Sequence, residues 1–175
     1  MKKVMGVLWV AMLAVSAWSF SAKPREKLNW LTMEEMQVAY QKEPRPVLVD
    51  LYTTWCGWCK EMDRTTYKNA KVVDYINQHF YAVKFDAESK RDVTFNNHVF
   101  KYNKEIKVHE LAMYFSFGQM EYPTTIFLAS PAARPAPLPG YLKPKELEAP
   151  LKYFAEGSME KESFVEFNSR FKNAW

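Results

Sequence analysis

The sequence predicts an α/β fold in which helices flank a mixed β-sheet. Three short apolar or alternating runs have the composition of strands and lie at residues 46–52, 80–86 and 124–128. Segments with helical character separate them, and strands that alternate with helices imply a parallel component in the sheet. The last two strands of the chain follow each other closely enough to pair as an antiparallel hairpin. We therefore expect one sheet that contains both kinds of pairing.

The first predicted helix spans residues 32–42. Thr32 and Glu35 have the spacing of a capping box, in which each side chain accepts a hydrogen bond from the backbone N–H of the other. Pro44 ends this helix, because a proline restricts the residue before it to extended conformations. The apolar run 46–52 that follows is typical of a buried strand.

A second helix is expected over residues 57–78, followed by the strand 80–86, in which apolar and polar side chains alternate. Residues 87–119 do not continue this alternation of helices and strands, and we interpret them as an insertion. Within the insertion, Asn96-Asn97 predicts the turn of a hairpin. A further helix is expected to begin near His109.

The C-terminal part supplies the rest of the fold. The proline-rich segment 131–139 predicts a turn, Tyr141 is expected in an edge strand, and residues 145–155 form a helix that packs back on the sheet. Residues 157–175 extend beyond this unit. Three phenylalanines at helical spacing predict an additional amphipathic helix in the extension: Phe164, Phe167 and Phe171.

Residues 1–22 have the layout of a secretory signal peptide, with two lysines, an apolar run to about Phe20 and then small residues. Cleavage after Ala17 and cleavage after Ala22 both fit the pattern. We expect the remainder, residues 23–175, to form a single domain in the periplasm or otherwise outside the cell. The alternative is an uncleaved helix that anchors the protein in a membrane, since the run approaches the length needed to span one.

Charge and histidine spacing argue against two classes of partner. The formal net charge of +4 falls to +2 when residues 1–22 are removed, and the basic residues form no tail or stripe, so we expect no nucleic-acid partner. His98 and His109 are eleven residues apart, which fits no short zinc-ligand spacing. We therefore expect no metal site and interpret both as ordinary surface or turn histidines.

The only two cysteines, Cys56 and Cys59, form a C-x-x-C motif between the strand 46–52 and the helix 57–78. This position is the signature of thiol–disulfide exchange. A helix N-terminus has unpaired N–H groups and a positive dipole end, which stabilise a thiolate. Because the thiolate is the species that attacks a disulfide, the motif predicts a redox-active Cys56–Cys59 disulfide with no other cofactor.

The residues around this motif resemble those of the thioredoxin superfamily, in particular secreted thioredoxin-like proteins with a W-C-x-x-C-K motif. Trp55 and Lys60 flank the cysteines as in that family, and Asp50 precedes Cys56 by the family's spacing from a buried acid to its nucleophile. Three later matches appear in the family's order: Lys84 in Val83-Lys84-Phe85-Asp86, Tyr122-Pro123-Thr124 at the cis-proline, and Gly140. The resemblance covers roughly residues 32–156.

The resemblance implies a thioredoxin-like fold, with an insertion before the cis-proline and an additional C-terminal helix. It also implies a set of site residues. The catalytic group would comprise Cys56, Cys59, Asp50 and Lys84. The substrate-binding group would comprise Trp55, Gly57, Trp58, Tyr122 and Pro123. From the position of the motif at a helix start, we expect Cys56 to be the exposed, acidic thiol that attacks and Cys59 to be the shielded thiol that resolves the mixed disulfide.

These observations predict a thiol–disulfide oxidoreductase that acts on protein disulfides. Thioredoxins usually have Gly-Pro between the cysteines and the strong secreted oxidants have Pro-His, whereas this chain has Gly57-Trp58. Without a charge there, the thiolate gains less stabilisation, which favours the reducing or isomerising direction and implies a membrane-embedded thiol donor. The alternative is a non-catalytic binding module whose disulfide is structural or sensing.

Overall fold

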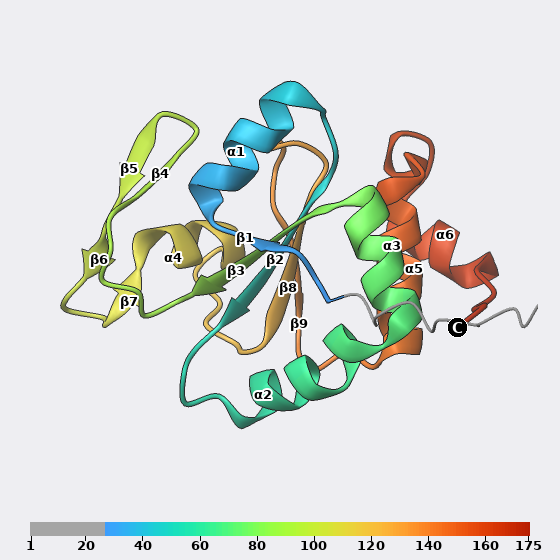
Figure 1. Cartoon of the computed structure of the whole chain (residues 1–175), viewed down its shortest axis with the longest axis horizontal. Helices are drawn as coiled ribbons and strands as arrows, with labels where there is room; N and C mark the ends of the chain where they lie inside the picture. Colours follow the sequence, from blue (N-terminus) through green and yellow to red (C-terminus); the bar gives the residue numbers. More distant parts are fainter. Residues whose placement is uncertain (1–26) are drawn as a thin grey trace, which may run out of the picture.

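The computed structural model describes residues 27–175, so the expected signal peptide lies outside the described residues. Its central sheet has five strands in the order β1-β3-β2-β8-β9 (Figure 1). Their bounds are β1 Trp30–Leu31, β2 Val47–Tyr52, β3 Tyr81–Asp86, β8 Thr124–Leu128 and β9 Ala136–Pro139. The strands β1 and β2 pair in parallel with β3, and β8 pairs antiparallel with β2 and with β9. The expected mixed sheet is confirmed, and β1 is an additional short strand.

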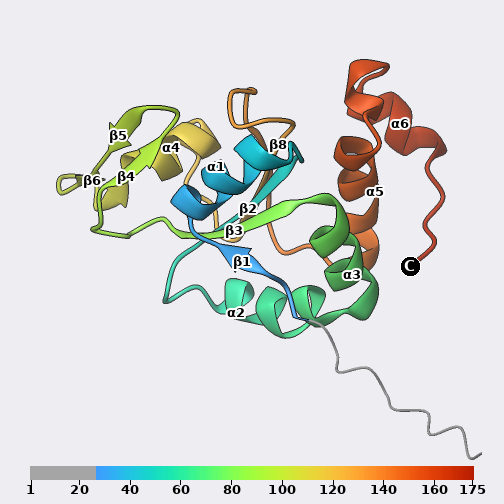
Figure 2. The same ribbon diagram turned by 45° about the horizontal axis from the view of Figure 1, so that its top comes forward.

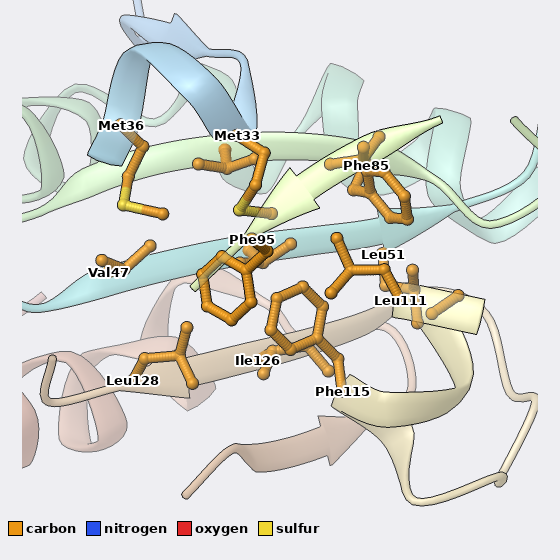
Figure 3. Close-up of a cluster of buried hydrophobic side chains, with 14 of the residues drawn as sticks. Met33, Met36, Val47, Leu51, Phe85, Phe95, Leu111, Phe115, Ile126 and Leu128 are labelled. Atoms are coloured by element: carbon orange, nitrogen blue, oxygen red, sulfur yellow. The ribbon is translucent and has the colours of Figure 1, made fainter. Parts of the chain in front are cut away.

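Helices cover both faces of this sheet. The first face carries α1 (Met33–Lys42) and α4 (Glu110–Ser116), and the second carries α3 (Ala70–His79) and α5 (Pro144–Ala155) (Figure 1). On the first face, methionines of α1 and aromatic and aliphatic side chains of α4 close over the strands (Figure 3). Successive residues of a strand point to opposite faces. Asp50 therefore shares the second face with Leu48, which packs there with α3 and α5.

The single helix predicted over residues 57–78 is wrong. The chain forms α2 (Gly57–Arg64), a 3₁₀ turn η1 (Thr66–Lys68) and then α3. The hydroxyl of Thr65 donates to the carbonyl of Glu61 at the end of α2. The Asn69 side chain accepts the backbone N–H groups of Lys71 and Val72, which is the N-cap arrangement that starts a new helix.

The edge strand also lies elsewhere than predicted. It is β9, inside the segment expected to be a turn, and Tyr141 follows it outside the sheet. Pro137 and Pro139 are two residues apart in β9, so both missing N–H groups lie on the same side of the strand. An edge strand tolerates this, because one of its sides has no neighbouring strand to bond.

The insertion begins after β3 and extends to one side of the sheet (Figure 2). It consists of the hairpin β4 (Val93–Phe95) and β5 (His98–Phe100), the hairpin β6 (Tyr102–Asn103) and β7 (Val108–His109), and then α4. The predicted turn is confirmed: Asn96 and Asn97 have φ values of 51° and 61°, in the left-handed region that asparagine tolerates.

His109 is not the surface or turn histidine that was expected. It is fully buried, and its Nδ1 accepts the backbone N–H of Leu111 at 3.1 Å, which caps the start of α4. Its Nε2 lies 3.1 Å from the carbonyl oxygen of Arg91. Burial lowers the pKa of this imidazole, so His109 acts as a neutral helix cap.

The C-terminal extension contains the expected helix, α6 (Phe164–Arg170), after the 3₁₀ turn η2 (Ser158–Glu160). The ribbon of α6 lies beside α5 on the side away from the sheet (Figure 2). Phe167 of α6 is buried in a cluster with Ala149 and Tyr153 of α5. The last residues then return along α5. The buried Glu148 carboxylate accepts the backbone N–H groups of Ala174 and Trp175 and fixes the tail there.

Across residues 27–175, no helix combines the length and the apolar character that crossing a membrane requires.

Candidate redox site

The two cysteines lie at the beginning of α2, directly after the loop that follows β2. Cys56 is the N-cap residue of α2 and Cys59 is in its first turn. A disulfide joins them, with their Cα atoms 5.3 Å apart. The backbone N–H of Cys56 donates to the carbonyl of Thr53 at 3.2 Å, which holds the loop against the helix start. The strand-to-helix position inferred for the motif is therefore confirmed.

The helix start provides a direct polar contact to the first sulfur. The backbone N–H of Cys59 donates to Sγ of Cys56 at 3.0 Å. A thiolate at Cys56 would accept this bond at the positive end of the helix dipole. The expected contrast in exposure, however, is absent in the disulfide form, where Cys56 and Cys59 are 5% and 4% exposed. Both cysteines are therefore shielded from solvent while the disulfide is formed.

Exposed aromatic rings flank the disulfide. Trp55 and Trp58 are each 64% exposed. Trp55 meets Tyr122 edge-on with ring centroids 6.0 Å apart, and Trp58 stacks on Tyr141 at 5.5 Å. The Tyr122–Pro123 peptide bond is cis, as expected. We call the four aromatic residues Trp55, Trp58, Tyr122 and Tyr141 the aromatic rim.

Two residues of the rim have polar contacts with residues that lie outside the rim. The indole N–H of Trp55 donates to the Glu88 carboxylate at 2.9 Å, and the Tyr141 hydroxyl lies 3.0 Å from that of Thr65. Sequence reasoning placed Tyr141 in a strand and so missed it. Gly57 is exposed, and a side chain there would meet no atom within 4 Å, so packing alone does not require a glycine at this position.

A buried acid and a lysine lie beneath the second face of the sheet. Asp50 is almost fully buried, and Lys84, its register partner on β3, places Nζ 3.4 Å from Asp50 Oδ2. Burial raises the pKa of Asp50 to about 7, although the ammonium of Lys84 opposes this shift. The expected burial of Asp50 and the orientation of Lys84 toward it are confirmed.

Sequence reasoning missed two neighbours of this pair. Asp63 on α2 also forms an ion pair with Lys84, and Tyr67 on η1 is buried beside Asp50. Asp63 is four residues after Cys59, a spacing that places both on one side of the helix and offered a signal. Tyr67 offered none, because the predicted continuous helix concealed the break that turns it inward.

The described part of the chain offers no group of side chains that could bind a metal ion. Within residues 27–175, no three histidine, cysteine, aspartate or glutamate side chains come together in a way that could hold a metal ion.

A protein-family profile matches most of the chain. The family is Thioredox_DsbH, described as "Protein of unknown function, DUF255", and the match covers residues 16–155. The chain belongs to this family. The match includes the disulfide, the buried acid and the cis-proline, so the protein is a member of the thioredoxin superfamily.

Solved structures show the same fold at low sequence identity. A thioredoxin-fold protein from Helicobacter pylori is 20% identical, with a TM-score of 0.57, over 72% of this chain and 79% of that one. A structure titled "DsbH Oxidoreductase" is 11% identical, with a TM-score of 0.54, over 88% and 95%. A putative disulphide-isomerase from Bacteroides thetaiotaomicron is 23% identical, with a TM-score of 0.53, over 81% and 100%. The expected thioredoxin-like fold is thereby confirmed.

One curated relative matches a short stretch. The "Thiol:disulfide interchange protein DsbD" of Pectobacterium atrosepticum is 34% identical over 44 residues. This stretch is 25% of the present chain and 8% of the relative, so the chain spans only a small part of that protein's length.

Proposed function

We propose that this protein is a thiol–disulfide oxidoreductase that acts on protein disulfides through Cys56 and Cys59. The observation that carries the proposal is the Cys56–Cys59 disulfide at the N-terminus of α2, where a backbone N–H already contacts the first sulfur. Similarity to proteins named an oxidoreductase and a thiol:disulfide interchange protein supports it. The disulfide itself is the redox group, with no metal or further cofactor.

The exchange begins from the reduced form. The Cys56 thiolate attacks a client disulfide, forms a mixed disulfide and releases one client thiolate. Asp50 accepts the proton of the Cys59 thiol, and Cys59 then attacks the Cys56 sulfur and displaces the second client thiolate. The client leaves reduced, and the Cys56–Cys59 disulfide forms again.

We place client binding at the aromatic rim. A client joined to Cys56 must lie beside Trp55 and Trp58, whose exposed rings offer apolar surface. Tyr122 contacts Trp55 and precedes the cis-proline Pro123, and we assign both residues to the same binding surface. At Gly57, no atom lies within 4 Å of the place a side chain would occupy, which leaves space beside the cysteines.

The direction is reducing or isomerising. Gly57 and Trp58 add no charge that would stabilise a thiolate beyond what the helix start provides. A couple of this kind needs electrons in an oxidising compartment, so a membrane-embedded thiol donor would regenerate the dithiol. The leader-like pattern of residues 1–22 places this exchange in the periplasm or outside the cell.

The second candidate is a non-catalytic binding module with a structural or sensing disulfide. The shielding of both cysteines in the disulfide form favours it, because structural disulfides are buried and resist reduction. The rim and the buried acid favour exchange, since a structural disulfide requires neither of them.

Dithiothreitol-dependent reduction of insulin separates the two candidates. The wild-type chain should accelerate the precipitation of insulin chains, and Cys56→Ser should abolish that acceleration, because the attacking thiol is lost. Thermal unfolding of Cys56→Ser is the matched control. A wild-type chain that leaves insulin reduction at the background rate, with a Cys56→Ser variant that unfolds many degrees lower, would establish the structural disulfide instead.

A further inference from the structure

The ammonium of Lys84 lies between two carboxylates that differ in exposure. Its Nζ is 3.4 Å from Asp50 on β2 and donates a hydrogen bond to Asp63 on α2. The exposed fractions of the three side chains are 3% for Asp50, 22% for Lys84 and 40% for Asp63. Lys84 therefore connects a carboxylate that water does not reach to one that it does.

Asp50, Lys84 and Asp63 are the charged groups at this position, and the other titratable groups around Asp50 are neutral. Tyr67 on η1 faces Asp50 with a neutral hydroxyl, because burial raises its pKa well above 10. Tyr52, two residues along β2, lies with its ring 5.0 Å from the Lys84 ammonium and is also neutral, since burial raises its pKa. The α2 start contributes the two cysteines, which do not titrate while they form the disulfide.

A cavity of about 460 Å³ opens on the Lys84–Asp63 pair. Trp30 of β1 and Tyr67 of η1 form part of its wall, and none of the rim residues lines it. Small solutes can therefore reach Lys84 without passing the surface on which we place the client.

We propose that Asp63 is a positioning residue of the redox site, which holds the Lys84 ammonium on its solvent side and so keeps that cation from pairing fully with Asp50. This inference rests on the proposed function, in which Asp50 takes the proton of Cys59. A carboxylate fully paired with an ammonium is a weak base. Sharing Lys84 with Asp63 therefore keeps Asp50 basic enough to deprotonate a thiol near neutral pH.

Removing the Asp63 carboxylate should act on Asp50 in one direction by two routes. Lys84 would pair with Asp50 alone, and a negative charge near Asp50 would disappear. Both changes stabilise the ionised form of Asp50 and lower its pKa from about 7. Replacing Lys84 by methionine removes the cation instead, so it should raise that pKa.

The experiment uses the reduced full chain and 5,5′-dithiobis(2-nitrobenzoate). Attack by Cys56 releases one thionitrobenzoate and leaves the other bound as a mixed disulfide, and attack by Cys59 releases the second. In Asp63→Asn, the pH midpoint of the second release should fall by about one unit. The plateau rate of the second release should also fall, by about tenfold, because Asp50 becomes a weaker base. The first release should be unchanged. Lys84→Met should move the midpoint upward.

The matched control is Glu61→Gln, which removes another carboxylate from α2. The Glu61 carboxylate pairs with Arg64 at 2.8 Å and not with Lys84. Glu61→Gln should leave both releases unchanged. In Asp63→Ala, added formate should restore the wild-type midpoint, because the cavity admits a small carboxylate to Lys84. A second release with an unchanged pH profile in Asp63→Asn, or the same change in Glu61→Gln, would overturn the inference.

Failure of the proposed function gives a different result. If the wild-type chain shows no second release at all, exchange through Cys59 does not occur. Titration of the Asp50 carboxyl by ¹³C NMR in the oxidised chain then decides the inference separately. A lower pKa in Asp63→Asn than in wild type supports it, and equal pKa values overturn it.

Discussion

At the scale of single residues, Asp50 is where the proposed function and the stability of the fold conflict most clearly. Its carboxyl is buried on the face of the sheet that α2, α3 and α5 cover, and burying a charge there is costly even with Lys84 beside it. In the proposed function, the benefit is a base that accepts the proton of the Cys59 thiol. The same burial that destabilises the ionised form raises the pKa of Asp50 into the range in which it can exchange protons.

We therefore expect Asp50→Asn to stabilise the fold in a pH-dependent way. Between about pH 4 and pH 7, Asp50 keeps its proton in the folded state, whereas the unfolded chain has lost it. The destabilisation of the fold by Asp50 is therefore complete above pH 7 and vanishes below about pH 4. Urea unfolding at pH 8 should show Asp50→Asn more stable by up to about 4 kcal/mol, with the difference shrinking toward zero at pH 4. A difference that is independent of pH would mean that Asp50 is not the titrating group.

At the scale of elements, local sequence signals predicted the ends of α1 and the turn of the β4–β5 hairpin, because capping boxes and Asn-Asn turns depend on neighbours along the chain. The break between α2 and α3 was not predicted, because an asparagine such as Asn69 inside a helical pattern does not by itself indicate a helix N-cap. The same limit applies to the site. The motif predicted Cys56 and Cys59, whereas Tyr141 required a tertiary contact to be found.

The additional helix α6 is an element whose value to stability can be measured. Phe167 packs against Tyr153 and Phe171 with ring centroids 5.3 and 5.4 Å away. Phe167→Ala should lower the free energy of unfolding by about 3 kcal/mol, because it leaves a cavity between α5 and α6. Val165→Ala is the control on the same helix, as Val165 is 77% exposed, and it should change stability by less than about 0.5 kcal/mol. Equal effects of the two changes would show that α6 does not pack in solution as described.

At the scale of the whole molecule, the fold provides a rigid platform with the Cys56–Cys59 disulfide at one end. Both faces of the sheet are covered by helices, so the packed core fixes α2 and the rim relative to the strands that carry Asp50 and Lys84. In the described chain, the first sulfur receives one backbone N–H and no charged side chain. In the proposed function, a Cys56 thiolate would therefore gain only modest stabilisation, which favours a couple that gives electrons readily.

Equilibration of the full chain with glutathione buffers tests this account most directly, because it asks whether the disulfide exchanges and in which direction. The Cys56–Cys59 couple should equilibrate reversibly, with a reduction potential close to the value of about −270 mV found for thioredoxin. A potential near the value of about −120 mV found for the strong secreted oxidants would reverse the direction proposed. A disulfide that does not exchange with glutathione at all would contradict the redox function itself.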